Sequence, residues 1–211
     1  MNLVGGTSLA KAAEHLRDDE VHVWRLPYTP SEGRAPLLAL LGAYLGRDAG
    51  SVHLVNGEYG RPGLAEASAL DFNWSHSGSL ALVALARGMA PGVDVERLRP
   101  RPRAWALAQR YFTPAEVAAL ARLAPGEREA AFLRLWTAKE AVLKALGRGL
   151  AFGLHRLDIE CEGQVPRLRA LEGDDAARWQ LHALRAGEDC VATLAWRGEA
   201  RQVRVWSLAQ G

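Results

Sequence analysis

Apolar side chains along the chain fall into short runs that predict strands and a few longer runs with helical spacing. Residues 20–26 (EVHVWRL) are rich in β-forming side chains and predict a strand. Short runs of the same kind predict further strands over 52–55, 72–75, 80–86, 92–96, 154–160, 180–184, 190–196 and 202–208. The chain therefore contains many short strands, most of them in its first half and at its end.

Three segments carry helix signals. Residues 35–45 have leucines at helical spacing and are followed by Gly46. Residues 113–116 (TPAE) combine a capping threonine, a proline at the first helical position and a glutamate at the third. A long helical pattern over 126–146 stops at Gly147. Strands and helices mix without regular alternation, which predicts an α+β fold.

Two segments are predicted to be irregular. Residues 59–63 (YGRPG) contain two glycines and a proline, so we expect no regular structure there. Residues 97–103 (RLRPRPR) hold two prolines and four arginines, which is typical of an extended, solvated linker.

Composition excludes several classes of protein. The 211 residues contain 26 Lys plus Arg and 24 Asp plus Glu, a net charge of +2 that is too small for a dedicated nucleic-acid binder. Cys161 and Cys190 form no disulfide framework or zinc spacing. No apolar run reaches the about 20 residues that cross a bilayer, and residues 1–19 lack the order of a signal peptide. We expect a soluble cytoplasmic protein that binds neither nucleic acid nor membrane.

Residues 92–96 (GVDVE) are the first candidate for chemistry. Side chains alternate along a strand, so Asp94 and Glu96 share one face. Neighbouring carboxylates repel one another unless a cation lies between them, and Mg²⁺ prefers such oxygen ligands. The alternative is an edge strand with a solvated acidic face.

The second candidate is the end of the long helix. Lys139 falls within an apolar stripe formed by Phe132, Leu135, Trp136, Leu143 and Leu146. An unpaired ammonium there is costly, so Lys139 must reach solvent, pair with a carboxylate or meet an anion. Glu140 and Lys144 stand four residues apart, and a surface ion pair is the simple alternative for these two.

The third candidate is residues 72–78 (FNWSHSG), a strand that ends in polar residues before a glycine. Ser75 and His76 can be presented to a ligand there, although the segment taken alone favours a strand-end turn with a half-buried histidine. The chain has no nucleophile elbow, Walker loop or GxGxxG fingerprint.

Taken together, these segments resemble a known family. Residues 92–96 and the W-T-A-K-E-A-x-x-K-x-x-G-x-G-L run over 136–150 are similar to the signature of the 4′-phosphopantetheinyl transferases of the surfactin-synthetase-activating type. The shorter blocks at 59–62, 72–77 and 112–116 match that type in the same order.

The resemblance implies a fold of two similar α+β halves in one chain, related by a pseudo-twofold axis, with the active site at their junction. It places the halves at residues 1–100 and 101–211. It implies Mg²⁺-dependent transfer of 4′-phosphopantetheine from coenzyme A to a serine of an apo acyl or peptidyl carrier protein, by a monomer. The runner-up is a Mg²⁺-dependent phosphodiester or pyrophosphate hydrolase, and a non-catalytic module that binds the carrier or coenzyme A is a third hypothesis.

The resemblance also assigns roles. Asp94, Glu96 and Glu140 are the expected Mg²⁺ ligands, and Glu140 or a water on the metal is the expected base. Lys144 is expected to stabilise or protonate the leaving phosphate, and His76 to bind phosphate oxygens in catalysis.

Coenzyme A is expected to contact Arg34, Arg61, Ser75, His76, Lys139 and Lys144. Arg61 stands where the family usually has lysine. Residues 27–36 are short and hold only Arg34, so the basic residues expected near the 3′-phosphate are partly missing. The arginines of residues 97–103 complement an acidic carrier protein, unless they only solvate the linker.

Overall fold

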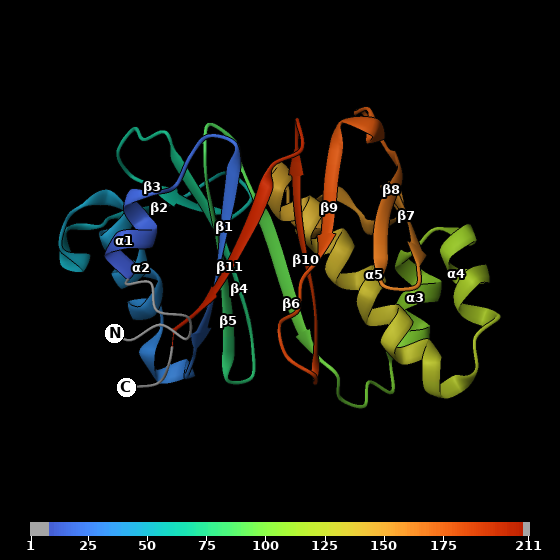
Figure 1. The fold of residues 1–211 in the computed structure, drawn as a ribbon. Helices are drawn as coiled ribbons and strands as arrows, with labels where there is room; N and C mark the ends of the chain where they lie inside the picture. Colours follow the sequence, from blue (N-terminus) through green and yellow to red (C-terminus); the bar gives the residue numbers. More distant parts are fainter. Residues whose placement is uncertain (1–8, 209–211) are drawn as a thin grey trace.

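Two sheets stand side by side in the middle of the molecule, and helices cover their outer faces (Figure 1). The computed structural model describes residues 9–208. The first sheet has the order β11-β1-β5-β4, with β1 (Glu20–Pro27), β4 (Leu70–Ser77), β5 (Leu80–Arg87) and β11 (Gln202–Ser207). The second has the order β6-β10-β9, with β6 (Gly92–Arg97), β9 (Trp179–Ala183) and β10 (Cys190–Arg197).

The remaining elements flank these sheets. Two small hairpins pair β2 (Leu54–Asn56) with β3 (Pro62–Leu64) and β7 (Leu157–Glu162) with β8 (Val165–Leu171). The helices are α1 (Leu9–Glu14), α2 (Ala35–Leu45), α3 (Ala104–Tyr111), α4 (Pro114–Ala121) and α5 (Pro125–Leu146). Over the described residues, no helix is both long and apolar enough to cross a membrane.

Three apolar clusters hold the layers together. Leu37 and Leu41 of α2 pack on Trp24 and Phe72 of the first sheet. In the other half, Ala138 and Val142 of α5 lie in a cluster that includes Ala195 of β10 and much of α3 and α4. The third cluster lies between the two sheets, where Val21, Val23, Leu82, Val93 and Leu194 have no more than 1% of their surface exposed. The α+β prediction is confirmed, with one long helix against each sheet.

Each half takes a strand from the other half's stretch of sequence. β6 lies before residue 100 but pairs with β10, and β11 near the chain end pairs in parallel with β1. Because the two sheets exchange strands in this way, their pairing does not test the division into residues 1–100 and 101–211, which stays a prediction.

Most of the predicted strands and helices are present in the structure, with the following differences. The structure adds α1, α3 and β8, which the sequence analysis did not predict. Residues 154–156 form a 3₁₀ turn before β7, so the expected strand over 154–160 begins only at Leu157. The expectation that residues 59–63 hold no regular structure is wrong at Pro62, which starts β3 opposite Asn56. A proline is tolerated there because it is the first residue of a short edge strand. Of the segment 1–19 considered for a signal peptide, residues 1–8 lie outside the described part of the chain.

Side chains, rather than main-chain pairing, join the two sheets. The backbone N–H of Val93 donates to Asn73 Oδ1 at 2.9 Å, and that of Val95 to Ser75 Oγ at 3.4 Å. The N–H of Arg97 donates to Ser77 Oγ at 3.1 Å. We call this contact between Asn73, Ser75 and Ser77 of β4 and the amides of β6 the seam. It satisfies amides of β6 that would otherwise be buried without an acceptor.

Gly92 sets how closely β6 approaches α5. A Cβ atom on Gly92 would collide with the carbonyl oxygen of Ala141 and with the backbone of Ala145. Since these are main-chain atoms of a packed helix, the contact cannot be relieved by a side-chain rotation.

We predict that Gly92→Ala destabilises the protein by about 3 kcal/mol, the usual upper range for overpacking in a core. Urea unfolding followed by circular dichroism measures this. Gly126→Ala is the matched control, because nothing lies within 4 Å of a Cβ added there. Equal stability of the two variants contradicts the role given to Gly92.

Candidate active site

Asp94 lies at the centre of the seam and is 6% exposed. Its Oδ1 accepts a hydrogen bond from Ser75 Oγ at 2.8 Å and forms an ion pair with Lys144 Nζ at 2.7 Å. Its Oδ2 is buried and has no partner in the structure. A buried carboxylate oxygen without a donor is costly, so this atom points to a ligand that the protein itself does not supply.

Lys144 joins α5 to β6. It lies in the last turn of the helix, and its Nζ also donates to the carbonyl oxygen of Val93 at 3.1 Å. A cation is favourable at a helix C-terminus because the carbonyl dipoles point there. Lys144 therefore lies beside Asp94, as the sequence analysis expected for two residues of one site.

Glu140 lies one turn earlier on the same helix and is partly buried. Burial, followed by the negative charge of Asp94, raises the pKa of Glu140 to about 7, and Glu96 adds to the rise while Lys144 opposes it. Because Asp94 and Glu96 both act on Glu140, the three predicted metal ligands lie in one region. The cost of their mutual repulsion is what a divalent cation removes.

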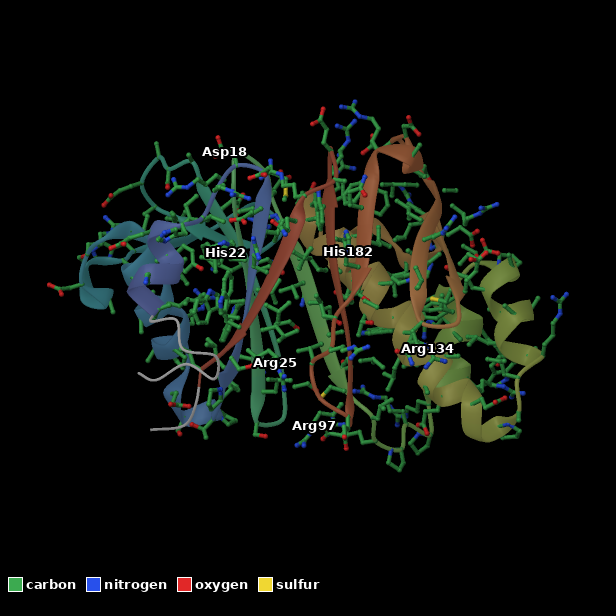
Figure 2. The ribbon with its side chains drawn as sticks, viewed as in Figure 1. Asp18, His22, Arg25, Arg97, Arg134 and His182 are labelled. Atoms are coloured by element: carbon green, nitrogen blue, oxygen red, sulfur yellow. The ribbon has the colours of Figure 1, made fainter. Side chains whose placement is uncertain are left out.

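Glu96 is turned toward cations of the protein itself. It accepts a hydrogen bond from Ser77 Oγ at 3.2 Å and forms an ion pair with Arg101 of the linker. The next residue, Arg97, forms an ion pair with Asp189 at 2.5 Å, at the lower end of the junction between the halves (Figure 2).

The donor set fits a hard divalent cation. Mg²⁺ is usually bound by one or two carboxylates together with phosphate oxygens, and Asp94 offers a buried carboxylate oxygen that has no partner. Within residues 9–208, however, no three His, Cys, Asp or Glu side chains lie close enough to hold a metal ion as they stand. In the structure Glu96 binds Arg101, whereas in an assembled metal site its carboxylate would bind the ion.

Arg61 has a structural position. Its guanidinium donates to the carbonyl oxygen of Lys144 at 2.9 Å, to Asp71 at 2.9 Å and to the carbonyl oxygen of Pro91 at 3.1 Å. A further hydrogen bond reaches the carbonyl oxygen of Phe72. Arg61 thus holds α5, β4 and the start of β6 together. These hydrogen bonds use Nε and one of the two terminal nitrogens, so the expectation that Arg61 contacts coenzyme A stays a prediction.

Ser75 and His76 point to opposite faces of β4. Ser75 belongs to the seam, where its hydroxyl donates to Asp94 and so positions that carboxylate. His76 is exposed and stacks on Tyr28 with ring centroids 4.4 Å apart. Its ring forms no hydrogen bond with the described residues, as is also true of the exposed Arg34 side chain before α2. His76 and Arg34 are therefore open to a ligand.

Lys139 does not belong to this site, and the expectation that it binds phosphate is corrected. It has 0% exposure and forms an ion pair with Glu116 of α4 at 2.7 Å. Its Nζ also donates to the carbonyl oxygens of Leu154 and Leu157. Of the three outcomes open for a lysine in an apolar stripe, the structure selects pairing with a carboxylate. Burial lowers the pKa of Lys139, and the charge of Glu116 opposes that shift.

The sequence analysis missed Asn73 and Ser77, and it expected Arg101 to complement a carrier protein rather than to pair with Glu96. A signal for the first two was present, because Asn73, Ser75 and Ser77 are polar at every second position of one strand. Such alternation predicts a polar face. No pattern in the sequence indicates that this face meets the amides of another strand, or that Arg101 reaches Glu96.

Asp94 and Glu96 of β6 and Glu140 of α5 thus lie with Lys144 at the junction of the two sheets, and Asp94 bonds Lys144 directly. Comparison with known proteins gives the family of the chain. Residues 90–195 match the family described as the 4′-phosphopantetheinyl transferase superfamily. The 4′-phosphopantetheinyl transferase HetI of Nostoc sp. is 33% identical over 226 residues, which cover 90% of this chain and 93% of HetI.

Two further similarities are partial. The 4′-phosphopantetheinyl transferase AcpT of Salmonella typhimurium is 38% identical over 94 residues, covering 44% of this chain and 49% of AcpT. The solved holo-[acyl-carrier-protein] synthase (AcpS) of Thermotoga maritima has a TM-score of 0.43 at 18% identity, over 53% of this chain and 64% of that one. The chain belongs to the 4′-phosphopantetheinyl transferase superfamily, which confirms the prediction of a transferase.

We predict that Lys139→Met lowers the free energy of unfolding by about 3–5 kcal/mol, because it leaves the buried Glu116 carboxylate without its partner. Urea unfolding measures the change. The double variant Lys139→Met/Glu116→Gln is the control and recovers part of the loss, since it removes the unpaired charge. A stable Lys139→Met protein with weakened coenzyme A binding returns Lys139 to the active site.

We predict that the metal-free protein loses stability as pH rises from about 5 to 8. The pKa of Glu140 is about 7 in the folded protein against 4.5 for the free side chain, so the folded state binds the proton more tightly in that interval. The stabilisation is present below the unfolded pKa and is lost as pH passes the folded pKa. Thermal unfolding in a chelator measures this, and Glu140→Gln flattens the profile. An unchanged profile in that variant contradicts the assignment.

Proposed function

We propose that this protein transfers 4′-phosphopantetheine from coenzyme A to a serine hydroxyl of an apo acyl or peptidyl carrier protein and releases adenosine 3′,5′-bisphosphate. The observation that carries the proposal is Asp94, a buried carboxylate at the seam with one oxygen unpartnered and the other bonded to Lys144. Superfamily membership supports this reaction over hydrolysis of a phosphodiester or pyrophosphate.

We assign the metal site to Asp94, Glu96 and Glu140. Mg²⁺ bound there would neutralise charge on the pyrophosphate of coenzyme A, which lowers the barrier to attack by an alcohol. Asp94 and Glu96 come from β6 and Glu140 from α5, so the close packing of Gly92 against α5 sets how near these donors approach one another.

The remaining chemistry belongs to two residues of α5. The oxygen of the carrier serine attacks the phosphorus that bears pantetheine, and the bond from that phosphorus to the nucleotide phosphate breaks. Glu140, or a water on the metal, would take the serine proton, because Glu140 is the carboxylate that α5 places beside Asp94 and Lys144. Lys144 provides a positive charge beside Asp94, where it stabilises the leaving phosphate.

The nucleotide end is assigned to His76 and Arg34, the predicted coenzyme A residues whose side chains remain open. Tyr28 stacks on the imidazole of His76 and fixes its plane. Lys139 is left out because it is buried and paired with Glu116, whereas Arg61 and Ser75 stay predicted contacts although they also bond within the protein.

The partner is an acidic carrier protein, which the exposed arginines Arg99 and Arg103 of the linker complement. We further propose the surfactin-synthetase-activating type, a monomer that acts in the cytoplasm without nucleic acid or membrane. Two sheets with one long helix each, in a single chain, support this type because one chain then supplies both sides of the junction.

Intact-mass spectrometry of an apo carrier protein tests the function. With coenzyme A and Mg²⁺, the wild-type protein is expected to add one phosphopantetheine to the carrier. Asp94→Ala is expected to lower the rate at least about 100-fold, because it removes a ligand of the ion that neutralises the pyrophosphate. Its circular dichroism spectrum serves as the control for folding.

The alternatives give different readouts. Cleavage of coenzyme A without a mass gain on the carrier supports the hydrolase. Binding of the carrier that persists unchanged in a chelator, with no reaction, supports the non-catalytic module. A folded Asp94→Ala protein with near-normal turnover removes the metal assignment.

A further inference from the structure

Glu96 already has a cation beside it, and this cation comes from the linker. Arg101, five residues after Glu96, donates from its terminal nitrogen to Glu96 Oε2. The same oxygen accepts from Ser77 Oγ at 3.2 Å. A carboxylate that is expected to bind a metal is therefore neutralised by a residue of the same chain.

The main chain at Arg101 is anchored separately from its side chain. The backbone N–H of Arg101 donates to the Glu129 carboxylate of α5, and Pro100 and Pro102 restrict the backbone on either side. The guanidinium can therefore leave Glu96 without a movement of the linker.

The side chain also has an incomplete set of partners and space beside it. Its Nε is buried without a hydrogen-bond partner, unlike that of a fully satisfied structural arginine. A groove of about 290 Å³ adjoins it, lined by Pro102, Trp105 and Glu129 among others. The Glu129 carboxylate offers an alternative acceptor within that groove.

We propose that Arg101 is a positioning residue that holds Glu96 in the metal-free enzyme and releases it when a divalent cation binds, so that Arg101 sets the affinity of the site for the metal. This proposal rests on the metal site of the proposed function.

The two cations next to the carboxylates differ in this respect. Lys144 bonds Oδ1 of Asp94 and leaves Oδ2 free, so a metal can bind Asp94 while Lys144 stays. Arg101 also bonds a single oxygen, Glu96 Oε2, but it turns that carboxylate toward the linker, and within the described residues Glu96 does not join Asp94 and Glu140 in a three-ligand group. A metal and Arg101 compete for Glu96, whereas a metal and Lys144 share Asp94.

Mn²⁺ binding to the full-length protein, measured by the electron paramagnetic resonance signal of free Mn²⁺ at about pH 8, tests this without any turnover. Arg101→Gln is expected to bind Mn²⁺ about fivefold more tightly than wild type, the effect of removing one partly exposed ion pair that competes with the metal. Arg99→Gln is the matched control, because it removes the same charge two residues away from an exposed side chain. Its affinity is expected to stay within about twofold of wild type.

A conservative variant and a stability measurement separate positioning from general electrostatics. Arg101→Lys keeps the charge and is expected to restore most of the wild-type affinity. In a chelator, Arg101→Gln is expected to melt at a lower temperature than wild type because Glu96 has lost its partner, and saturating Mn²⁺ is expected to raise its melting temperature by more than that of wild type.

Equal Mn²⁺ affinity in wild type and Arg101→Gln, or an equal gain in Arg99→Gln, overturns the proposal. Failure of every variant to bind Mn²⁺ overturns both this proposal and the metal site. Tighter binding by Arg101→Gln, together with no transfer to any carrier by wild type, supports the role of Arg101 and overturns only the proposed function.

Discussion

The arrangement of this molecule depends on a hydrogen-bond pattern in which side chains of one strand replace a main-chain neighbour. The amides of Val93, Val95 and Arg97 face β4 and find their acceptors in Asn73, Ser75 and Ser77. Leaving such amides buried and unpaired costs free energy comparable to a lost hydrogen bond each. The seam therefore fixes how the two sheets stand relative to each other, and the same serines also bond the carboxylates of Asp94 and Glu96.

Charges at the seam are balanced within the protein, but only partly. Lys144 and Arg101 each bond one carboxylate, whereas Asp94 Oδ2 has no donor and Glu140 has a raised pKa. Low dielectric surroundings strengthen both the attractions and the repulsions among these groups. The result is a site with negative charge that a divalent cation can neutralise, in which Glu96 is bonded to Arg101 and, within the described residues, the three carboxylates do not yet form a metal-binding group.

Not every conspicuous residue serves the site. Lys139 stands out in the sequence because a charge interrupts an apolar stripe, yet it lies on the far side of α5 and pairs with Glu116 of α4. Neighbours on a helix point in different directions, so Lys139 supports the helical layer while Glu140 faces the seam. The same reasoning separates Ser75 from His76 on β4. Arg61 matched a family block, and in the structure its guanidinium bonds Lys144 of α5 and Asp71 of β4, so it holds these two elements together.

Local patterns were enough to predict most strands and helices, the α+β class, the linker and the acidic pair of β6, because periodicity and turn residues act within a few positions of the chain. The match of several short blocks to one family also pointed correctly to a transferase. What the tertiary structure alone decided was the pairing of groups remote in sequence: Arg101 with Glu96 through the path of the linker, Lys144 with Asp94 across 50 positions, and β6 with β4 through side chains. These contacts depend on how two sheets and a helix pack, and no local pattern carries that information.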